Sequence, residues 1–88
     1  MLFTVELDNT EGLERIFIYL DSEGLEYLMK ELEHMRRGRI PDHWHLKTES
    51  WNGCELTETR LQSDLKLVNN LEIEYLPDND DGVQNATS

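Results

Sequence analysis

The chain opens with a strict alternation of apolar and polar residues. The alternating positions are Phe3, Thr4, Val5, Glu6, Leu7 and Asp8. This is the period of a half-buried strand. Turn-forming residues follow at 8–12, and the run Ile16–Leu20 then combines β-branched and aromatic residues on both of its faces. The pattern predicts two neighbouring strands, with the second at the centre of the sheet.

The next segment has helical spacing. Its apolar residues are Leu25, Leu28, Met29, Leu32 and Met35. Asp21 and Ser22 precede them and offer side-chain oxygens for the helix N-cap. Arginines gather at the other end, where Gly38 and then Pro41 supply a stop signal. The segment therefore predicts an amphipathic helix of about four turns.

Two short alternating runs, 42–48 and 54–58, flank the turn Trp51-Asn52-Gly53. This arrangement is typical of a β-hairpin. Alternation places His43 and His45 on one face of the first strand, with Trp44 and Leu46 on the other.

The last apolar run places Leu65, Leu67, Leu71, Ile73 and Tyr75 at odd positions. Asn69-Asn70 interrupts this run without shifting its parity, which favours one long strand over two. Pro77 ends the strand. Residues 78–88 are acidic and poor in apolar side chains, and they are predicted to form a disordered tail.

The resulting order, ββαβββ, predicts an α+β domain over residues 1–77. We expect two layers, an antiparallel sheet of about five strands with the amphipathic helix on one face. The other face of the sheet should then be polar and accessible to a partner. Its expected residues are Thr4, Glu6, His43, His45, Lys47, Glu55, Thr57, Glu72 and Glu74, joined by Phe17 and Tyr19 if the second strand turns them the same way.

Charge narrows the choice of partner. The 88 residues include 19 acidic and 8 basic side chains, which give a formal net charge of −11. Nucleic-acid and anionic-membrane binding would require a positive face, so neither is predicted. A basic protein partner fits this charge. Cys54 is the only cysteine, and the N-terminus lacks a basic leader, so we expect a reducing, cytoplasmic setting.

The sequence gives little evidence for a metal site or a catalytic centre. His43 and His45 with Glu55 or Glu72 could ligate a metal, but such pairs are more often ordinary surface residues, so no metal or cofactor is predicted. Alternation with Leu56 predicts that Cys54 is buried. A two-layer domain of this size has little room for a deep pocket, and no enzymatic activity is expected. Trp51 is either folded onto the sheet or exposed to a partner.

The motifs resemble those of the immunity protein 32 family of bacterial polymorphic toxin systems. The resemblance extends from about residue 13 to residue 76. It is carried by Asp21-Ser22-Glu23-Gly24-Leu25, Asp42-His43-Trp44-His45-Leu46, Thr48, Trp51-Asn52-Gly53, Glu55-Leu56-Thr57-Glu58 and the run from Leu67 to Tyr75. It implies a small cytosolic protein, encoded beside a toxin, that binds and neutralises this toxin.

Together these observations predict inhibition of a basic toxin by occlusion. The expected partner-binding residues are His43, His45, Trp51, Glu55, Glu72 and Glu74. The alternative is a homodimeric accessory domain without catalysis, which would use the same sheet face to pair with itself or to hold a small ligand or a metal ion.

Overall fold

The computed structural model describes residues 1–12 and 14–78. This part of the chain contains five strands, one α-helix and a short 3₁₀-helix, η1. In chain order they are β1 (Phe3–Asp8), β2 (Arg15–Leu20), α1 (Ser22–Gly38), β3 (Asp42–Lys47), η1 (Glu49–Trp51), β4 (Lys66–Leu67) and β5 (Asn70–Tyr75). The predicted α+β class and the order ββαβββ are confirmed. The predicted tail lies outside the described residues, apart from Asp78.

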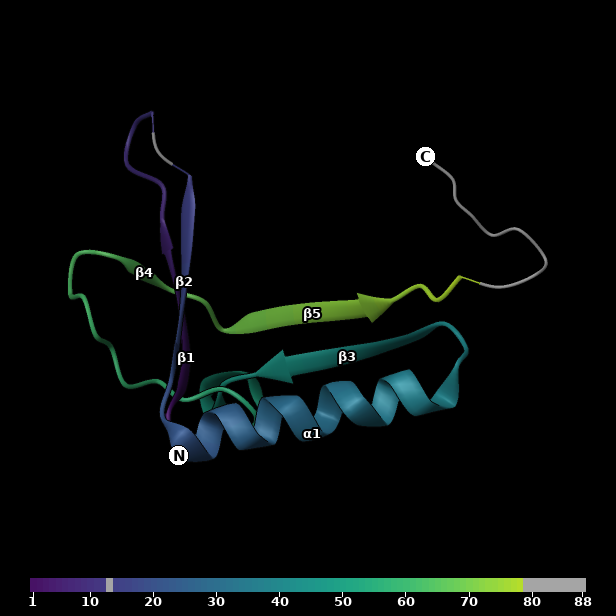
Figure 1. Ribbon diagram of the computed structural model, residues 1–88. Helices are drawn as coiled ribbons and strands as arrows, with labels where there is room; N and C mark the ends of the chain where they lie inside the picture. Colours follow the sequence, from purple (N-terminus) through teal and green to yellow (C-terminus); the bar gives the residue numbers. More distant parts are fainter. Residues whose placement is uncertain (13, 79–88) are drawn as a thin grey trace.

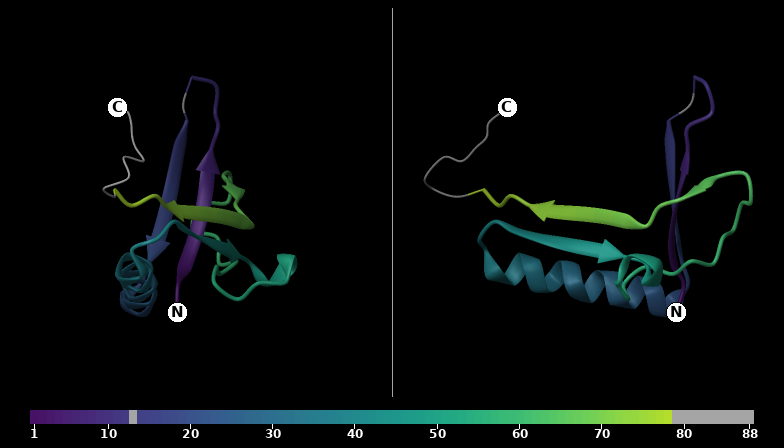
Figure 2. Two further views of the ribbon diagram at one scale, coloured as in Figure 1. Left: turned by 90° about the vertical axis from the view of Figure 1, so that its right-hand side faces the viewer. Right: turned by 180° about the vertical axis from the view of Figure 1, so that it is seen from behind.

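The five strands are divided between two antiparallel sheets. One has the order β2-β1-β4 and the other consists of β3 and β5. In Figure 1, the axes of α1, β3 and β5 lie roughly parallel, with β3 running opposite to β5, while the β1–β2 hairpin stands across them at the N-terminal end of α1. Figure 2 shows the same crossed arrangement from two further sides.

The predicted hairpin over 42–58 is wrong, because β3 pairs with β5 and residues 54–58 form no strand. After β3 the chain turns through η1, and Asn52 adopts a left-handed conformation with φ 65°. Gly53 then lies against Lys47, so closely that an added Cβ would be 2.5 Å from the Lys47 carbonyl oxygen. The amide of Leu56 still donates to that oxygen, at 3.1 Å. Between the two expected strands, one backbone hydrogen bond from Leu56 to Lys47 and the close approach of Gly53 to Lys47 therefore replace the expected ladder.

The single long strand predicted over 65–75 is also wrong. Within it, β4 pairs with β1 and β5 pairs with β3. The change of sheet occurs at Val68 and Asn69. The Val68 amide donates to the Val5 carbonyl at 2.9 Å, whereas the Asn69 carbonyl accepts from the Thr48 amide at 3.1 Å. The Thr48 hydroxyl also donates to Asn69 Oδ1, at 2.6 Å. Asn69 thus fixes the point at which the chain passes from one sheet to the other.

β1, rather than β2, is the central strand of its sheet, and it is buried on both faces. Phe3 and Val5 join Leu46 and Leu56 in the apolar core. Thr4 and Glu6, which were expected on an exposed face, are 0% exposed. The alternation of β1 therefore separates two buried environments, one apolar and one polar.

Segment 57–62 covers the polar face of β1. The Thr4 hydroxyl lies 2.6 Å from the hydroxyl of Thr57 and 2.8 Å from the Thr59 carbonyl, to which it donates. The amide of Leu61 donates to Glu6 Oε2 at 2.7 Å. These side chains are short enough to bond to the backbone of a passing segment, and the segment in turn removes them from water.

Helix α1 begins as predicted, with Asp21 accepting a hydrogen bond from the Gly24 amide at 2.7 Å. It ends at Gly38, and Arg39 follows in a left-handed conformation. Leu28 packs against the core, and Met35 is buried. The rest of the expected apolar face stays exposed, since Leu25, Met29 and Leu32 retain 47%, 57% and 41% of their accessible surface.

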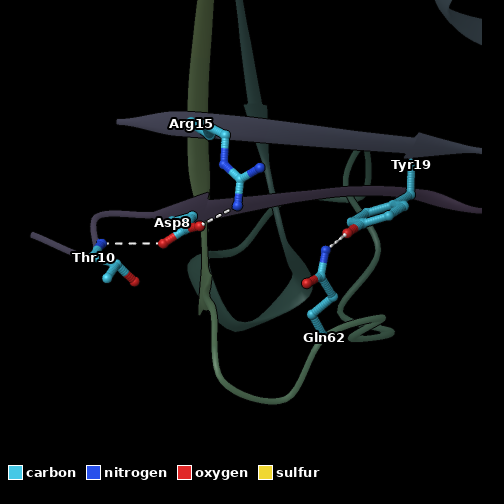
Figure 3. A network of polar contacts seen from close by, with 5 residues as sticks. All are labelled: Asp8, Thr10, Arg15, Tyr19 and Gln62. Carbon is cyan, nitrogen blue, oxygen red and sulfur yellow. Dashed lines mark hydrogen bonds and ion pairs between the residues drawn. The ribbon is translucent and has the colours of Figure 1, made fainter. Parts of the chain in front are cut away.

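Side-chain hydrogen bonds join β1 to β2 and join β2 to segment 57–62 (Figure 3). Asp8 accepts from the Arg15 guanidinium at 2.9 Å and from the Thr10 amide at 3.1 Å. These hydrogen bonds, that of Arg15 first, lower the pKa of Asp8 to about 2. On the same face of the hairpin, Gln62 donates to the Tyr19 hydroxyl and joins β2 to the covering segment.

The close approach at the start of α1 gives a first prediction. An added Cβ at Gly24 would lie 1.9 Å from the Leu2 carbonyl oxygen, so the backbone would have to move. We expect Gly24→Ala to lower the free energy of unfolding by about 1–3 kcal/mol. Gly38 has nothing within 4 Å of its added Cβ, and Gly38→Ala should leave stability unchanged or raised by up to about 1 kcal/mol. Urea unfolding of both variants measures the difference, and equal stabilities would contradict the contact.

A second prediction concerns pH. Because the pKa of Asp8 is about 2 in the folded protein and 3.8 ordinarily, the unfolded chain takes up this proton first as the pH falls. Ionised Asp8 therefore stabilises the fold above about pH 4, and this contribution disappears between about pH 4 and pH 2. The difference in melting temperature between the wild type and Asp8→Asn should shrink over this window. A difference that stays constant would show that Asp8 is not stabilised as described.

Candidate protein-binding site

The outer face of the β3–β5 ladder brings together four of the six predicted partner-binding residues. His43 stands opposite Glu74 in the register, and His45 stands opposite Glu72. All four side chains are exposed. We call this group, His43, His45, Glu72 and Glu74, the His–Glu face. The paired strands fix the backbone positions of these four residues, which lowers the backbone entropy lost when a partner binds.

Contacts within the His–Glu face are loose. The rings of His43 and His45 meet edge to face, with centroids 4.9 Å apart. His45 Nδ1 lies 3.6 Å from Glu72 Oε1, longer than an ordinary hydrogen bond. The inward orientation of the alternate residues is as predicted, because Leu46 is 0% exposed and Trp44 packs against the core. The outward side chains thus keep donor and acceptor capacity for a partner.

Glu55 is not part of this face. Its Oε1 accepts hydrogen bonds from the amides of Lys47, at 3.0 Å, and Cys54, at 3.3 Å. Burial acts to raise the pKa of Glu55, but the backbone donors prevail and lower it. The carboxylate therefore holds the chain after η1 against the end of β3, which is a structural task.

Trp51 lies at the surface, with 52% of its area exposed, so the choice left open by the sequence is resolved in favour of exposure. Its position is nevertheless held by the backbone, since its amide donates to the Thr48 carbonyl at 2.9 Å. The neighbouring Ser50 amide donates to Glu58 at 2.8 Å, and Ser50 lowers the pKa of Glu58. The indole thus projects from a turn attached to the Lys47 end of β3.

Cys54 is exposed, and its predicted burial is wrong. The prediction depended on alternation with Leu56 in a strand, and residues 54–58 do not form one. Leu56 alone reaches the core, where it is 4% exposed.

The depressions found on the described surface are open to solvent. One of about 470 Å³ is lined by Arg36, Arg37, Arg39, Tyr75, Pro77 and Asp78. Another of about 320 Å³ lies between α1 and β5. Over residues 1–12 and 14–78, no three His, Cys, Asp or Glu side chains are grouped so that they could hold a metal ion. Within the same ranges, no helix is both long and apolar enough to cross a membrane.

Sequence reasoning missed one further surface. Ile16 and Ile18 of β2 are 64% and 51% exposed, although they belong to a run that was expected at the centre of a sheet. The available signal was the apolar character of this run on both faces, which is typical either of a central strand or of an interface.

Comparison with known proteins finds no match among protein-family models, curated proteins or solved structures. The resemblance to the immunity protein 32 family therefore stays an expectation based on the motifs. Two of these motifs, the segment around His43 and His45 and the run ending at Tyr75, lie in β3 and β5 and pair directly with each other.

The two roles of the glutamates can be separated by their effect on stability. Glu55→Ala removes the acceptor for two backbone amides, and we expect it to lower the free energy of unfolding by about 1–3 kcal/mol. Glu72→Ala removes an exposed side chain and should change stability by less than about 0.5 kcal/mol. Chemical denaturation of both variants checks this. A larger loss in Glu72→Ala would mean that the His–Glu face is itself structural.

Proposed function

We propose that the protein is an immunity protein that binds a basic protein toxin and neutralises it by occlusion, without catalysis. The observation that carries this proposal is the His–Glu face, a block of exposed, hydrogen-bonding side chains held on paired strands. Such a surface suits protein recognition because it presents charged and polar groups in a fixed arrangement. The motif resemblance supports the same conclusion.

Charge supports the choice of a basic partner. The net charge of −11 produces a negative field that attracts a positively charged domain and raises its association rate. Glu72 and Glu74 stand on the exposed face of β5 and can meet lysine or arginine side chains directly. A toxin that acts on nucleic acid would carry such a positive surface, and covering it would block access of the substrate.

Trp51 supplies the apolar component. Buried tryptophans are over-represented among the residues that dominate binding energies. The indole is half exposed in the free protein and follows the end of β3 by four residues, and we include it as an apolar contact for the partner. Glu55 is left out of the proposed contacts because two backbone amides occupy its Oε1.

The test is recovery of the tagged protein from its own host, with bound proteins identified by mass spectrometry. We expect one basic protein at low salt and much less of it at about 0.5 M salt, where charges more than a few ångströms apart are screened. Replacing Glu72 and Glu74 together by Gln should weaken binding of that protein by roughly tenfold.

The matched control is Glu11→Gln with Glu26→Gln, which changes the net charge equally at two other exposed positions. This control should retain most of the affinity. Equal losses in the two double variants would show that only overall charge matters. Binding that is insensitive to salt would contradict electrostatic capture.

A further inference from the structure

β2 is a long, open edge. It pairs with β1 along all six of its residues, from Arg15 to Leu20, and among residues 1–12 and 14–78 no other strand lies on its far side in the order β2-β1-β4. The opposite edge of this sheet is β4, which has only two residues. Edge strands present unpaired N–H and C=O groups, and short edges limit the exposure. β4 is protected in this way, whereas β2 is not.

The composition of β2 also lacks the usual protection against pairing. Its sequence, Arg-Ile-Phe-Ile-Tyr-Leu, contains no proline, lysine or acidic residue. The other six-residue strands all carry at least one carboxylate, at Glu6, Asp8, Asp42, Glu72 and Glu74. In a chain of net charge −11, β2 is therefore the long strand along which two copies can approach without opposing carboxylates.

Both faces of β2 offer groups that fit a second β2. On one face, Ile16 and Ile18 stand opposite Leu7 and Val5 in the register. They therefore extend the apolar face of β1 sideways, but they are exposed to solvent. On the other face, the rings of Phe17 and Tyr19 are stacked at 6.0 Å, and the Arg15 guanidinium lies 5.1 Å from the Phe17 centroid. The single charge of the strand thus already lies over an aromatic ring.

We propose that two copies of this chain pair antiparallel through β2 and form one continuous six-stranded sheet. A two-fold axis perpendicular to the sheet at Phe17 sets Ile16 opposite Ile18 of the second copy. It also sets Arg15 opposite Tyr19 of the second copy. Because the parity of the strand is kept, apolar side chains meet apolar ones on one face, and the arginine meets an aromatic ring on the other. Two-fold symmetry repeats each contact.

The net negative charge of each copy opposes this dimer, and this repulsion predicts how dimerisation depends on salt. Each copy carries a net charge of −11, and salt screens the repulsion between them. The dimer should therefore become stronger as salt is added, whereas capture of a basic toxin should become weaker. The dimer does not depend on the proposed function, and the opposite salt effects keep the two apart.

Analytical ultracentrifugation of the full chain tests the proposal. We expect the mean mass to rise from 10.4 kDa toward twice that value with protein concentration, and to rise at lower concentration when salt is added. Ile16→Lys places two cations in the symmetric contact and should raise the dissociation constant by roughly tenfold or more. A mass that stays at that of the monomer at all concentrations and salt levels overturns the proposal.

Ile40→Lys is the matched control, because Ile40 and Ile16 are both 64% exposed. It should dimerise like the wild type, and equal weakening by both substitutions would contradict the β2 interface. Ile18→Thr, which keeps a β-branched residue in the strand, serves as a second interface variant if Ile16→Lys unfolds, and it too should weaken the dimer. Met29→Lys probes the exposed side of α1. A dimer lost in Met29→Lys but kept in the β2 variants would place the contact on the helix instead.

Discussion

The burial of β1 on both faces is the constraint on which the rest of the structure depends. One face lies in the apolar core through Phe3 and Val5. The other is sealed by segment 57–62, to which the Thr4 hydroxyl donates and from which the Glu6 carboxylate accepts hydrogen bonds. Within the described residues, Glu6 Oε1 has no hydrogen-bond partner, so this burial carries a desolvation cost. Two backbone amides, those of Leu61 and Gln62, offset it at Glu6 Oε2.

This constraint explains why the strands divide into two sheets. Thr57, whose amide donates to the Phe3 carbonyl and whose hydroxyl bonds to Thr4, lies against β1, and residues 54–58 form no ladder with β3. β5 takes that place, and the chain reaches it from β4 through Val68 and Asn69. The hairpin consequently stands across the layer formed by α1, β3 and β5 (Figure 1). Two distinct surfaces result, the His–Glu face on one sheet and the β2 edge on the other.

The sequence correctly predicted the features that depend on neighbouring residues. The alternation of β1 and β3, the Asp21 cap and the inward orientation of Leu46 could all be read from neighbouring residues, because side-chain period and capping act over a few positions. The grouping of His43 and His45 with Glu72 and Glu74 also follows from alternation, once β3 and β5 are paired.

The incorrect predictions concern residues whose position depends on a partner far away in the sequence. Alternation cannot tell a solvent-facing Thr4 from one that bonds to a segment more than fifty residues away. Residues 54–58 alternate like a strand, yet the Glu55 side chain takes the amide of Lys47 that a strand would have bonded. The exposure of Cys54 follows from the second of these contacts, and β2 lies at an edge because β1 pairs with β4 on its other side. Pairing is a long-range property, and composition alone did not reveal it.

The most direct test is hydrogen exchange of the Leu61 amide, measured by NMR beside the amides of β1. If segment 57–62 seals β1, the Leu61 amide, bonded to Glu6 at 2.7 Å, should exchange as slowly as the amides of β1 itself, because both open in one step. Exchange of Leu61 at the rate of an unstructured peptide, while β1 stays protected, would contradict the account.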